Sequence, residues 1–173
     1  MEELNVNIRQ ATKHDCPEIM RLIQELADFE NMSDQVHLDA ETLAKDGFET
    51  DNPSFKCLVI DDPENSGSSE APKLIGYALY NIIYGTWEGK RMWLEDIMVM
   101  NKYRVKGIGK RLFSAVCKEA LKENAKAVRF VALKWNPAME FYKKFGTINL
   151  TETEEWQFSL LQHEDIVKAA NLF

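Results

Sequence analysis

Two periodicities alternate along the chain and predict a sheet protein with helices between its strands. Apolar residues that alternate or run continuously predict strands at Asn5–Arg9, Phe55–Ile60, Lys73–Tyr84, Trp93–Met100, Ala127–Leu133, Thr147–Leu150 and Trp156–Leu161. Apolar residues at helical spacing predict helices from Asp15 to about Asn31, at Asp39–Lys45, from Gly107 to about Glu123, at Ala138–Phe145 and at His163–Asn171. The resulting order, βααβββαβαββα, is typical of an α/β or α+β protein.

Glycine, proline and polar residues mark the turns between these elements. Gly85–Gly89 is predicted to be a hairpin turn with Trp87 at its tip. Trp87 is a candidate contact for a ligand there, and packing in the core is the alternative. Asp61–Pro72 reads as a polar loop. Gly76 lies inside a predicted strand, where glycine is typical of a bulge or of a close approach by another segment.

Composition narrows the class of protein. With 173 residues, the chain is expected to form a single domain, residues 1–173. The net charge of -7 disfavours nucleic acid and anionic membranes as the main partner and is compatible with a cationic small molecule. No apolar run reaches the roughly 18 residues of a membrane span. The start, Met-Glu-Glu-Leu-Asn, does not resemble a signal peptide, and Cys16, Cys57 and Cys117 lack zinc spacing, so we expect a cytoplasmic protein with free thiols and no metal.

The predicted strand Trp93–Met100 carries two acids among its apolar residues. Glu95 and Asp96 interrupt the run in mid-strand. A carboxylate on a buried strand is costly unless it is paired or used. Because successive side chains of a strand point to opposite faces, Asp96 is expected to face away from Glu95 and to have a positioning role only. Glu95 is the candidate for chemistry, with a structural ion pair as the alternative.

A turn with two glycines follows this strand and begins the next predicted helix. Its pattern is Arg104-x-x-Gly107-x-Gly109. Glycines let an anionic group approach the backbone, and the amides and dipole at the start of a helix favour negative charge. The cations around the turn are Arg104, Lys106, Lys110 and Arg111. Together these features predict a pyrophosphate site, with a solvated basic turn as the alternative.

Two other phosphate motifs do not fit this turn. A Walker A loop begins with glycine and ends with serine or threonine, and this chain has Arg104 and Arg111 at those places. A dinucleotide fingerprint needs its third glycine where this chain has Leu112. The pattern that remains is Arg-x-x-Gly-x-Gly.

From Trp93 to Gly146 the chain resembles the GNAT superfamily of acetyl-CoA-dependent N-acetyltransferases. The matching features are the Arg104-x-x-Gly107-x-Gly109 loop, the helix after it, a strand ending at Asn136 and the helix end Phe141–Gly146. This resemblance implies an α/β (α+β) fold with a mixed, mostly antiparallel twisted sheet, flanking helices and splayed central strands. It also implies acetyl-CoA as co-substrate and no metal.

Over about residues 6 to 160 the chain resembles one member family, the diamine (spermidine/spermine) acetyltransferases. The matching motifs include Ile8-Arg9-x-Ala11-Thr12, Asp46-Gly47-Phe48, Cys57-Leu58-Val59 and Leu94-Glu95-Asp96. Within this family the thialysine N-epsilon-acetyltransferase branch fits best, on the motifs Ala27-Asp28-Phe29-Glu30, Ser33–Val36, Tyr84-Gly85-Thr86-Trp87 and Leu150–Trp156.

The resemblance implies transfer of an acetyl group from acetyl-CoA to the primary amine of a small cationic acceptor. Thialysine is the expected acceptor, with spermidine or spermine as the alternative. An alternative of another class is a non-catalytic acyl-CoA-binding regulatory module. The family also implies a homodimer. The residues that it assigns to the donor are Ile97, Met98, Val99, Arg104, Val105, Lys106, Gly107, Ile108, Gly109, Lys110, Asn136, Pro137, Ala138 and Met139.

Acetyl transfer needs a base for the amine, a donor for the developing oxyanion and an acid for the thiolate. The resemblance supports Glu95 as the base, acting through water, and burial on an inner strand is expected to raise its pKa toward neutrality. It implies Tyr142 as the acid, with core packing as the alternative. The interval from Asn136 to Tyr142 is one residue shorter than is usual in the family.

Acids and aromatic rings suit a cationic acceptor, because carboxylates attract an ammonium group and ring faces give cation–π contacts. Arg21 is a candidate partner for the carboxylate of thialysine. The resemblance assigns the acceptor to Phe29, Glu30, Trp87, Glu95, Arg129, Phe130, Val131 and Glu154.

Overall fold

The computed structural model describes residues 4–64 and 73–172. Most of the polar loop predicted at Asp61–Pro72 therefore lies outside the described residues. The chain divides into two compact units, Met1–Val131 and Ala132–Phe173, which we call the N-terminal and C-terminal units. Each is described by itself, and the single domain stays a prediction.

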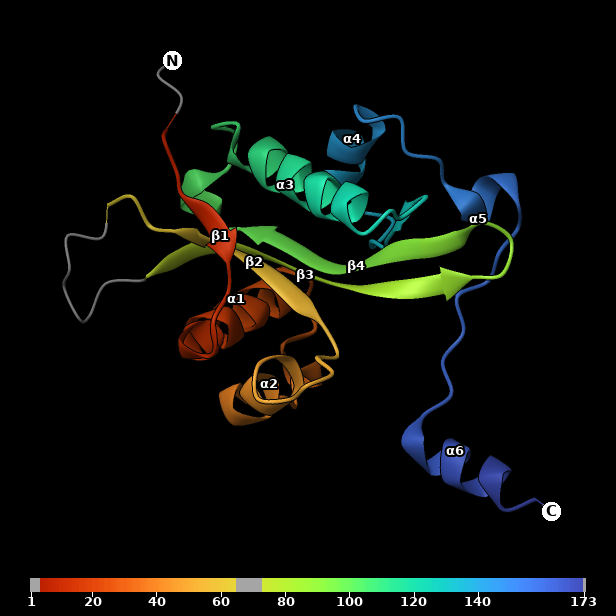
Figure 1. The fold of residues 1–173 in the computed structure, drawn as a ribbon. Helices are drawn as coiled ribbons and strands as arrows, with labels where there is room; N and C mark the ends of the chain where they lie inside the picture. Colours follow the sequence, from red (N-terminus) through yellow and green to blue (C-terminus); the bar gives the residue numbers. More distant parts are fainter. Residues whose placement is uncertain (1–3, 65–72, 173) are drawn as a thin grey trace. The chain divides into compact units, whose positions relative to one another are not determined.

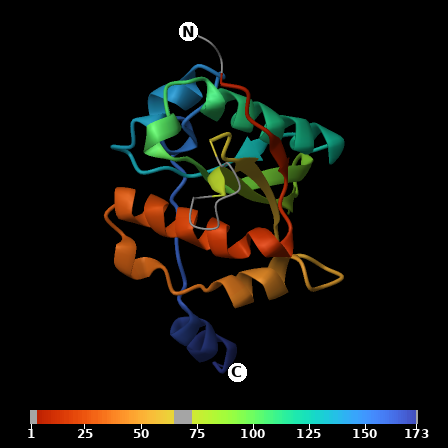
Figure 2. The same cartoon turned by 90° about the vertical axis from the view of Figure 1, so that its left-hand side faces the viewer.

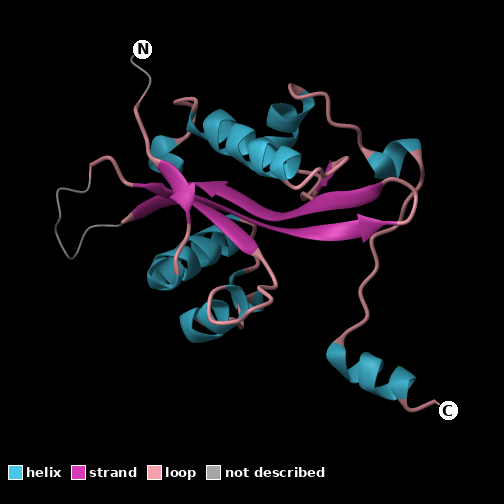
Figure 3. Cartoon of the chain, in the orientation of Figure 1, coloured by secondary structure: helices cyan, strands magenta, loops and turns pink. Residues whose placement is uncertain are grey.

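The N-terminal unit contains one five-stranded sheet (Figures 1 and 3). Neighbouring strands follow the order of the chain, and each pair is antiparallel except the parallel pair of β4 with β5. The predicted α/β fold with a mixed, mostly antiparallel sheet is confirmed. The strands are β1 (Ile8–Gln10), β2 (Lys56–Asp61), β3 (Leu74–Gly85), β4 (Gly89–Val99) and β5 (Val128–Arg129).

Helices cover both faces of this sheet, with α1 and α2 on one face and α3 on the other (Figures 1 and 2). Apolar residues of α1 and α2 pack with Val59, Tyr77 and Met98 of the sheet in one buried cluster. The α-helices are α1 (Cys16–Phe29), α2 (Ala40–Gly47) and α3 (Ile108–Lys122), and the short 3-10 turns are η1 (Lys13–Asp15), η2 (Ser33–Gln35) and η3 (Asn101–Tyr103).

Two glycines of the sheet behave as predicted. Gly85 is paired with Gly89 across the β3–β4 turn, so the predicted hairpin is confirmed. Gly76 lies against β4, because a Cβ atom added there would stand 2.6 Å from the carbonyl oxygen of Met98. The close approach expected at Gly76 is therefore confirmed.

The C-terminal unit differs from the prediction. The predicted strand Thr147–Leu150 is wrong: the Asn149 side chain accepts a hydrogen bond from the Thr151 amide at 3.2 Å, and this cap begins a helix instead. The predicted strand Trp156–Leu161 is also wrong, because no strand lies beside it among the described residues of this unit. The unit contains α4 (Ala138–Lys143), α5 (Leu150–Thr153) and α6 (His163–Ala170).

The strand predicted at Ala127–Leu133 is reduced to Val128–Arg129. β5 pairs with β4 only at Met92 and Trp93, and the apolar residues beyond this point have no strand partner in the described chain. An apolar pattern alone does not make a strand, since the ladder of hydrogen bonds needs a neighbour.

Candidate active site

A bulge lies in β4 at its acidic pair. Asp96 is opposite Leu79 of β3, and Leu94 is opposite the next residue, Tyr80. Glu95 is therefore the extra residue of β4 at this point. Bulges re-aim side chains and change the alternation of the strand beyond them, and they are frequent beside active sites.

The bulge sets which edge of β4 each backbone amide faces. Met92 donates to a carbonyl beside β5 at 2.9 Å, and Met100 donates to a carbonyl of β3, also at 2.9 Å. In a regular strand these two amides, an even number of residues apart, would face the same edge. After the bulge, Ile97 and Val99 face the edge toward β5. That stretch of edge has no strand partner among the described residues, so its amides are placed for a ligand.

The bulge also brings both carboxylates to one face of the sheet. Tyr77 and Met98 are paired and belong to the cluster under α1, and Asp96 precedes Met98 by two residues, so Asp96 faces α1. Side chains alternate along β3, and the β3 residue opposite Trp93 is on the same face as Tyr77. Trp93 therefore shares this face, and its indole N–H donates to the carboxylate of Glu95. The expectation that Asp96 faces away from Glu95 is wrong, because it assumed a strand without a bulge.

Of the two carboxylates, Asp96 is the more buried and Glu95 the more exposed. Glu95 is exposed, so the desolvation expected for it is not found. Asp96 is half-buried, and the Tyr77 hydroxyl donates to its Oδ2 at 2.9 Å. Burial raises the pKa of Asp96 to about 6, the bond from Tyr77 opposes this rise, and the charges of Glu95 and Glu30 add to it.

The end of α1 contributes Phe29 and Glu30 to the same region. Burial raises the pKa of Glu30, whose charge acts on Asp96. The guanidinium of Arg104 lies 4.8 Å from the centre of the Phe29 ring. Arg104 Nε also donates to the Val99 carbonyl at 2.9 Å. Arg104 thus connects the end of β4 to the end of α1.

The predicted phosphate turn has the backbone expected of an anion site. Gly107 is the N-cap of α3 at φ 78°, and a Cβ atom added there would meet nothing within 4 Å. Val105, fully exposed, also has a positive φ of 63°. Two of the four predicted cations donate hydrogen bonds to protein carbonyls instead: Arg104 to Val99, and Arg111 to Leu4 and Val6 at 2.9 and 3.0 Å. A third, Lys106, lies 5.5 Å from the centre of the Tyr103 ring.

The β3–β4 hairpin presents Trp87, which is 75% exposed. Arg91 of β4 is buried and donates to Glu88 at 3.0 Å. Of the residues predicted after β4, Arg129 is paired with Trp93, and Phe130 contacts the ring of Phe113 edge-on at 6.4 Å between centroids. Val131 is exposed.

The remaining predicted residues lie in the C-terminal unit, so their place beside Glu95 stays a prediction. Tyr142 is buried in α4, with its ring 5.3 Å from that of Phe141. The Asn136 side chain accepts a hydrogen bond from the Ala138 amide at 2.9 Å and so caps the start of α4. Glu154 accepts a hydrogen bond from the indole of Trp156.

Comparison with known proteins identifies the family. The model of the acetyltransferase (GNAT) family matches residues 19–147, which include the bulged strand, the glycine turn and α4. The chain belongs to the GNAT acetyltransferase family. The predictions of this family and of an acetyltransferase are confirmed, and acetyl-CoA is the acetyl donor that GNAT acetyltransferases use.

Relatives within the GNAT family include two kinds of amine acetyltransferase. The thialysine N-epsilon-acetyltransferase of Mus musculus is 43% identical over 153 residues, which are 88% of this chain and 89% of that protein. The human spermidine/spermine N(1)-acetyltransferase-like protein 1 is 36% identical over 165 residues, 94% of this chain but 23% of that protein. An integron cassette protein from the mobile metagenome of V. cholerae has the same fold, with a TM-score of 0.73 at 22% identity over 97% of this chain and 99% of that one.

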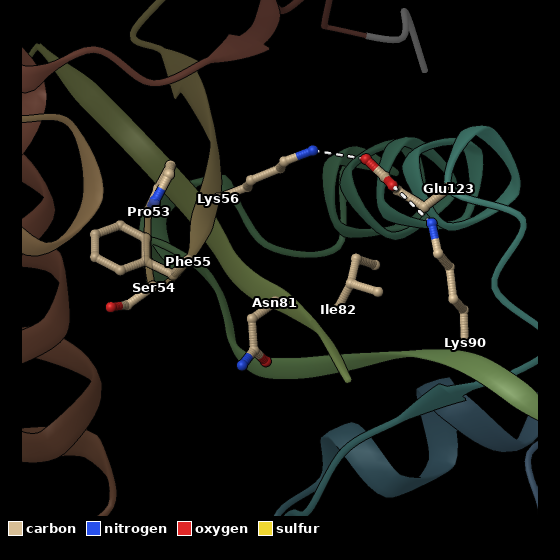
Figure 4. Close-up of a pocket in the computed structure, with 8 residues that line it drawn as sticks. All are labelled: Pro53, Ser54, Phe55, Lys56, Asn81, Ile82, Lys90 and Glu123. Atoms are coloured by element: carbon tan, nitrogen blue, oxygen red, sulfur yellow. Dashed lines mark hydrogen bonds and ion pairs between the residues drawn. The ribbon is translucent and has the colours of Figure 1, made fainter. Parts of the chain in front are cut away.

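Two further features of this GNAT chain lie outside the predicted site. A hollow of about 310 Å³ lies beside β2 and β3, where Lys56 and Lys90 approach Glu123 at 2.6 and 3.9 Å, and no predicted site residue lines it (Figure 4). Within residues 4–64 and 73–172, no group of three or more His, Cys, Asp and Glu side chains is arranged to hold a metal ion. Nor does any described helix have the length and apolarity needed to cross a membrane.

One residue of this GNAT chain lies beside the candidate site without having been indicated by the sequence. Tyr77 sits in an apolar run of β3, where it reads as ordinary core. Its hydroxyl partner, Asp96, is on another strand, and the pair follows from the register of β3 against β4. The pairing of Tyr77 with Asp96 therefore becomes visible only when the register of the two strands is known.

Proposed function

We propose that this acetyltransferase moves the acetyl group of acetyl-CoA to the epsilon-amine of thialysine. The observation that carries the proposal is the bulge in β4, because one extra residue gathers Glu95 and Asp96 on one face and turns the amides of Ile97 and Val99 toward an open edge. The identity of 42–43% to three mammalian enzymes named thialysine N-epsilon-acetyltransferase supports this acceptor.

The donor site uses main-chain groups for most of its contacts. The amides of Ile97 and Val99 bind the thioester carbonyl and the pantetheine arm, and the turn Val105–Lys110 binds the pyrophosphate. The empty space beside Gly107 fits an anionic group close to the backbone. Lys106 and Lys110 supply the positive charge, since Arg104 and Arg111 bind protein carbonyls. Asn136, Pro137, Ala138 and Met139 are the further residues that we propose for the pantetheine arm.

The reaction proceeds by attack of the free amine on the thioester. Glu95 takes the ammonium proton through a water molecule, and the amine nitrogen then attacks the carbonyl carbon. The oxyanion is stabilised by the β4 amides until the carbon–sulfur bond breaks. Tyr142 gives its proton to the coenzyme A thiolate, and the second proton that the attacking nitrogen loses as the amide forms returns to the Tyr142 phenolate by way of water. The acceptor is held by Glu30, Glu95 and Glu154 and by the side chains of Phe29, Trp87, Arg129, Phe130 and Val131.

A polyamine is the second candidate acceptor, and one contact favours it. Arg21 was expected to meet the carboxylate of thialysine, but its guanidinium donates to the Leu74 carbonyl at 2.8 Å and pairs with Glu18 at 3.0 Å. The acids Glu30, Glu95 and Asp96 suit a second ammonium group equally well. The human relative named for spermidine and spermine is consistent with such an acceptor.

Acetylation assays with thialysine, lysine, spermidine, spermine and putrescine test the proposal. We expect the purified chain with acetyl-CoA to release thiol fastest with thialysine. A clear preference for spermidine or spermine would show that the acceptor is a polyamine and not thialysine. Binding of acetyl-CoA without turnover on any amine would contradict the enzyme and favour the acyl-CoA-binding module.

The proposal extends to the state of the protein in the cell. We propose a cytoplasmic homodimer formed from single-domain protomers, acting on small molecules without nucleic acid or membrane partners and without a metal. The free cysteines Cys16, Cys57 and Cys117 suit a reducing compartment. Exposed apolar residues of the C-terminal unit, Phe158, Leu160 and Leu161, supply a surface for the second protomer.

Replacing Gly107 by alanine tests the pyrophosphate turn. At φ 78° an L-residue is strained by about 1–2 kcal/mol, and the new methyl group would stand where the anion is expected. We expect the KM for acetyl-CoA to rise about tenfold, with a lower Tm. Gly89→Ala is the matched control, because Gly89 also has a positive φ, 90°, with nothing within 4 Å. An equal KM for acetyl-CoA in the two variants would contradict the assignment.

A further inference from the structure

The Tyr77 hydroxyl has a specific acceptor beside the proposed base. Tyr77 is fully buried on β3, and its hydroxyl donates to Asp96 Oδ2 at 2.9 Å. The bulge places Asp96 on the same face as the Glu95 side chain, next to it in the chain. A tyrosine that only packs in the core could donate its hydroxyl to any acceptor. The acceptor here is the carboxylate beside the proposed base.

We infer that Tyr77 is a positioning residue for acetyl transfer, whose hydroxyl holds the Asp96 carboxylate beside Glu95 on the face where the acceptor ammonium binds. The inference rests on the proposed function and deepens it. In its ionised form Asp96 supplies a negative charge that attracts the ammonium group, and Glu95 remains the proton acceptor. Tyr77 acts only through Asp96.

The groups around Asp96 determine when its carboxylate is charged. From the elements packed against it these are Tyr77 of β3, Cys57 of β2, Glu30 at the end of α1 and Glu95 on its own strand. Burial raises the pKa of the Cys57 thiol and, with the nearby Asp96 charge, that of the Tyr77 hydroxyl, so both stay neutral near pH 7. The acids Glu30 and Glu95 disfavour a third negative charge. The bond from Tyr77 therefore favours the ionised form of Asp96 against its surroundings.

The pH dependence of activity separates this role from packing. The pKa of Asp96, about 6, predicts that kcat/KM has an acid limb near that pH, since the protonated carboxyl no longer attracts the ammonium. Removing the hydroxyl in Tyr77→Phe takes away a bond to the charged form, so the limb should move up by about one pH unit. Within the limb, kcat/KM falls about tenfold relative to wild type, and above about pH 8 the ratio is constant.

The experiment measures kcat/KM from about pH 5 to pH 9 with the best acceptor, as the ratio of variant to wild type. This ratio cancels the titration of the free acceptor amine, which both enzymes share. The matched control is Tyr80→Phe, because Tyr80 is also fully buried on β3, but its hydroxyl lies 3.4 Å from Gln10 Nε2, which donates to it. We expect the ratio for Tyr80→Phe to be independent of pH.

A second arm tests whether Tyr77 acts through Asp96. Asp96→Asn keeps an oxygen that accepts the Tyr77 hydroxyl and removes the charge, so the limb should disappear. Adding Tyr77→Phe to Asp96→Asn should then leave the shape of the profile unchanged. The inference is overturned if Tyr77→Phe shifts the limb equally in the Asp96→Asn background, or if it leaves the wild-type limb in place. A wild type that acetylates no amine would instead overturn the proposed function, and the inference with it.

Discussion

Replacing Glu95 by glutamine is expected to lower kcat by about 10²–10⁴-fold while the affinity for acetyl-CoA stays unchanged. The amide cannot accept the ammonium proton, so the acceptor remains in its unreactive form. Binding of acetyl-CoA should be kept, because the groups that we propose to hold it, the amides of Ile97 and Val99 and the glycine turn, belong to the main chain. Stopped-flow or steady-state thiol release gives kcat, and calorimetry gives the Kd for acetyl-CoA.

The control for this prediction is Glu41→Gln. Glu41 lies on α2, with its side chain 78% exposed and paired with Lys45 at 2.9 Å, so the same chemical change there should leave kcat within about twofold of wild type. Equal turnover by Glu95→Gln and Glu41→Gln would show that Glu95 is not the base. Asp96, the other carboxylate on that face, would then be the first alternative.

Replacing Gly76 by alanine is expected to destabilise the fold by about 1–3 kcal/mol, since the methyl group has no room. The added Cβ would stand 2.6 Å from the Met98 carbonyl oxygen and 3.1 Å from Ile60 Cδ1. The carbonyl belongs to the backbone of β4 and can move only with the strand. Thermal unfolding should show a decrease in Tm of about 3–10 °C.

Gly85→Ala provides the comparison for Gly76→Ala. It places the same methyl group on the same strand, 2.5 Å from the Arg91 guanidinium, but that group ends a flexible side chain that can shift. The loss of Tm should therefore be smaller for Gly85→Ala. If both variants unfold at the same temperature, the close approach of the β4 backbone is not the reason why alanine at position 76 destabilises the fold.

Residues that are close in sequence revealed most of the fold. The predicted helix around Leu22 and Leu26 is α1, and the helix predicted at His163–Asn171 is α6 within one residue. Local patterns were sufficient there because a helix makes its hydrogen bonds within itself. The strand predicted at Trp156–Leu161 failed for the opposite reason, since a strand needs a partner that its own residues do not specify.

The candidate site shows the same division. The glycine turn and the acids of β4 are contiguous motifs, and the sequence alone indicated them. The bulge at Glu95 was not predictable, because it is a property of two strands in register rather than of one. Without the bulge, regular alternation puts Asp96 on the opposite face from Glu95 and gives Tyr77 no carboxylate partner. The structural partners of Arg104 and Arg111 are carbonyls of other segments, which no local pattern specifies.

The extra residue in β4 also constrains how this enzyme can change in evolution. Deleting one residue of the segment from Leu94 to Asp96 would restore the regular alternation and turn the amides of Ile97 and Val99 toward β3. The acidic face and the amide edge would then be lost together, so the arrangement of this strand depends on its length as well as on the identity of Glu95 and Asp96. Substitutions at the end of α1 and in the β3–β4 hairpin leave the length of β4 unchanged, so we expect them to alter the proposed acceptor site without moving the amides of Ile97 and Val99.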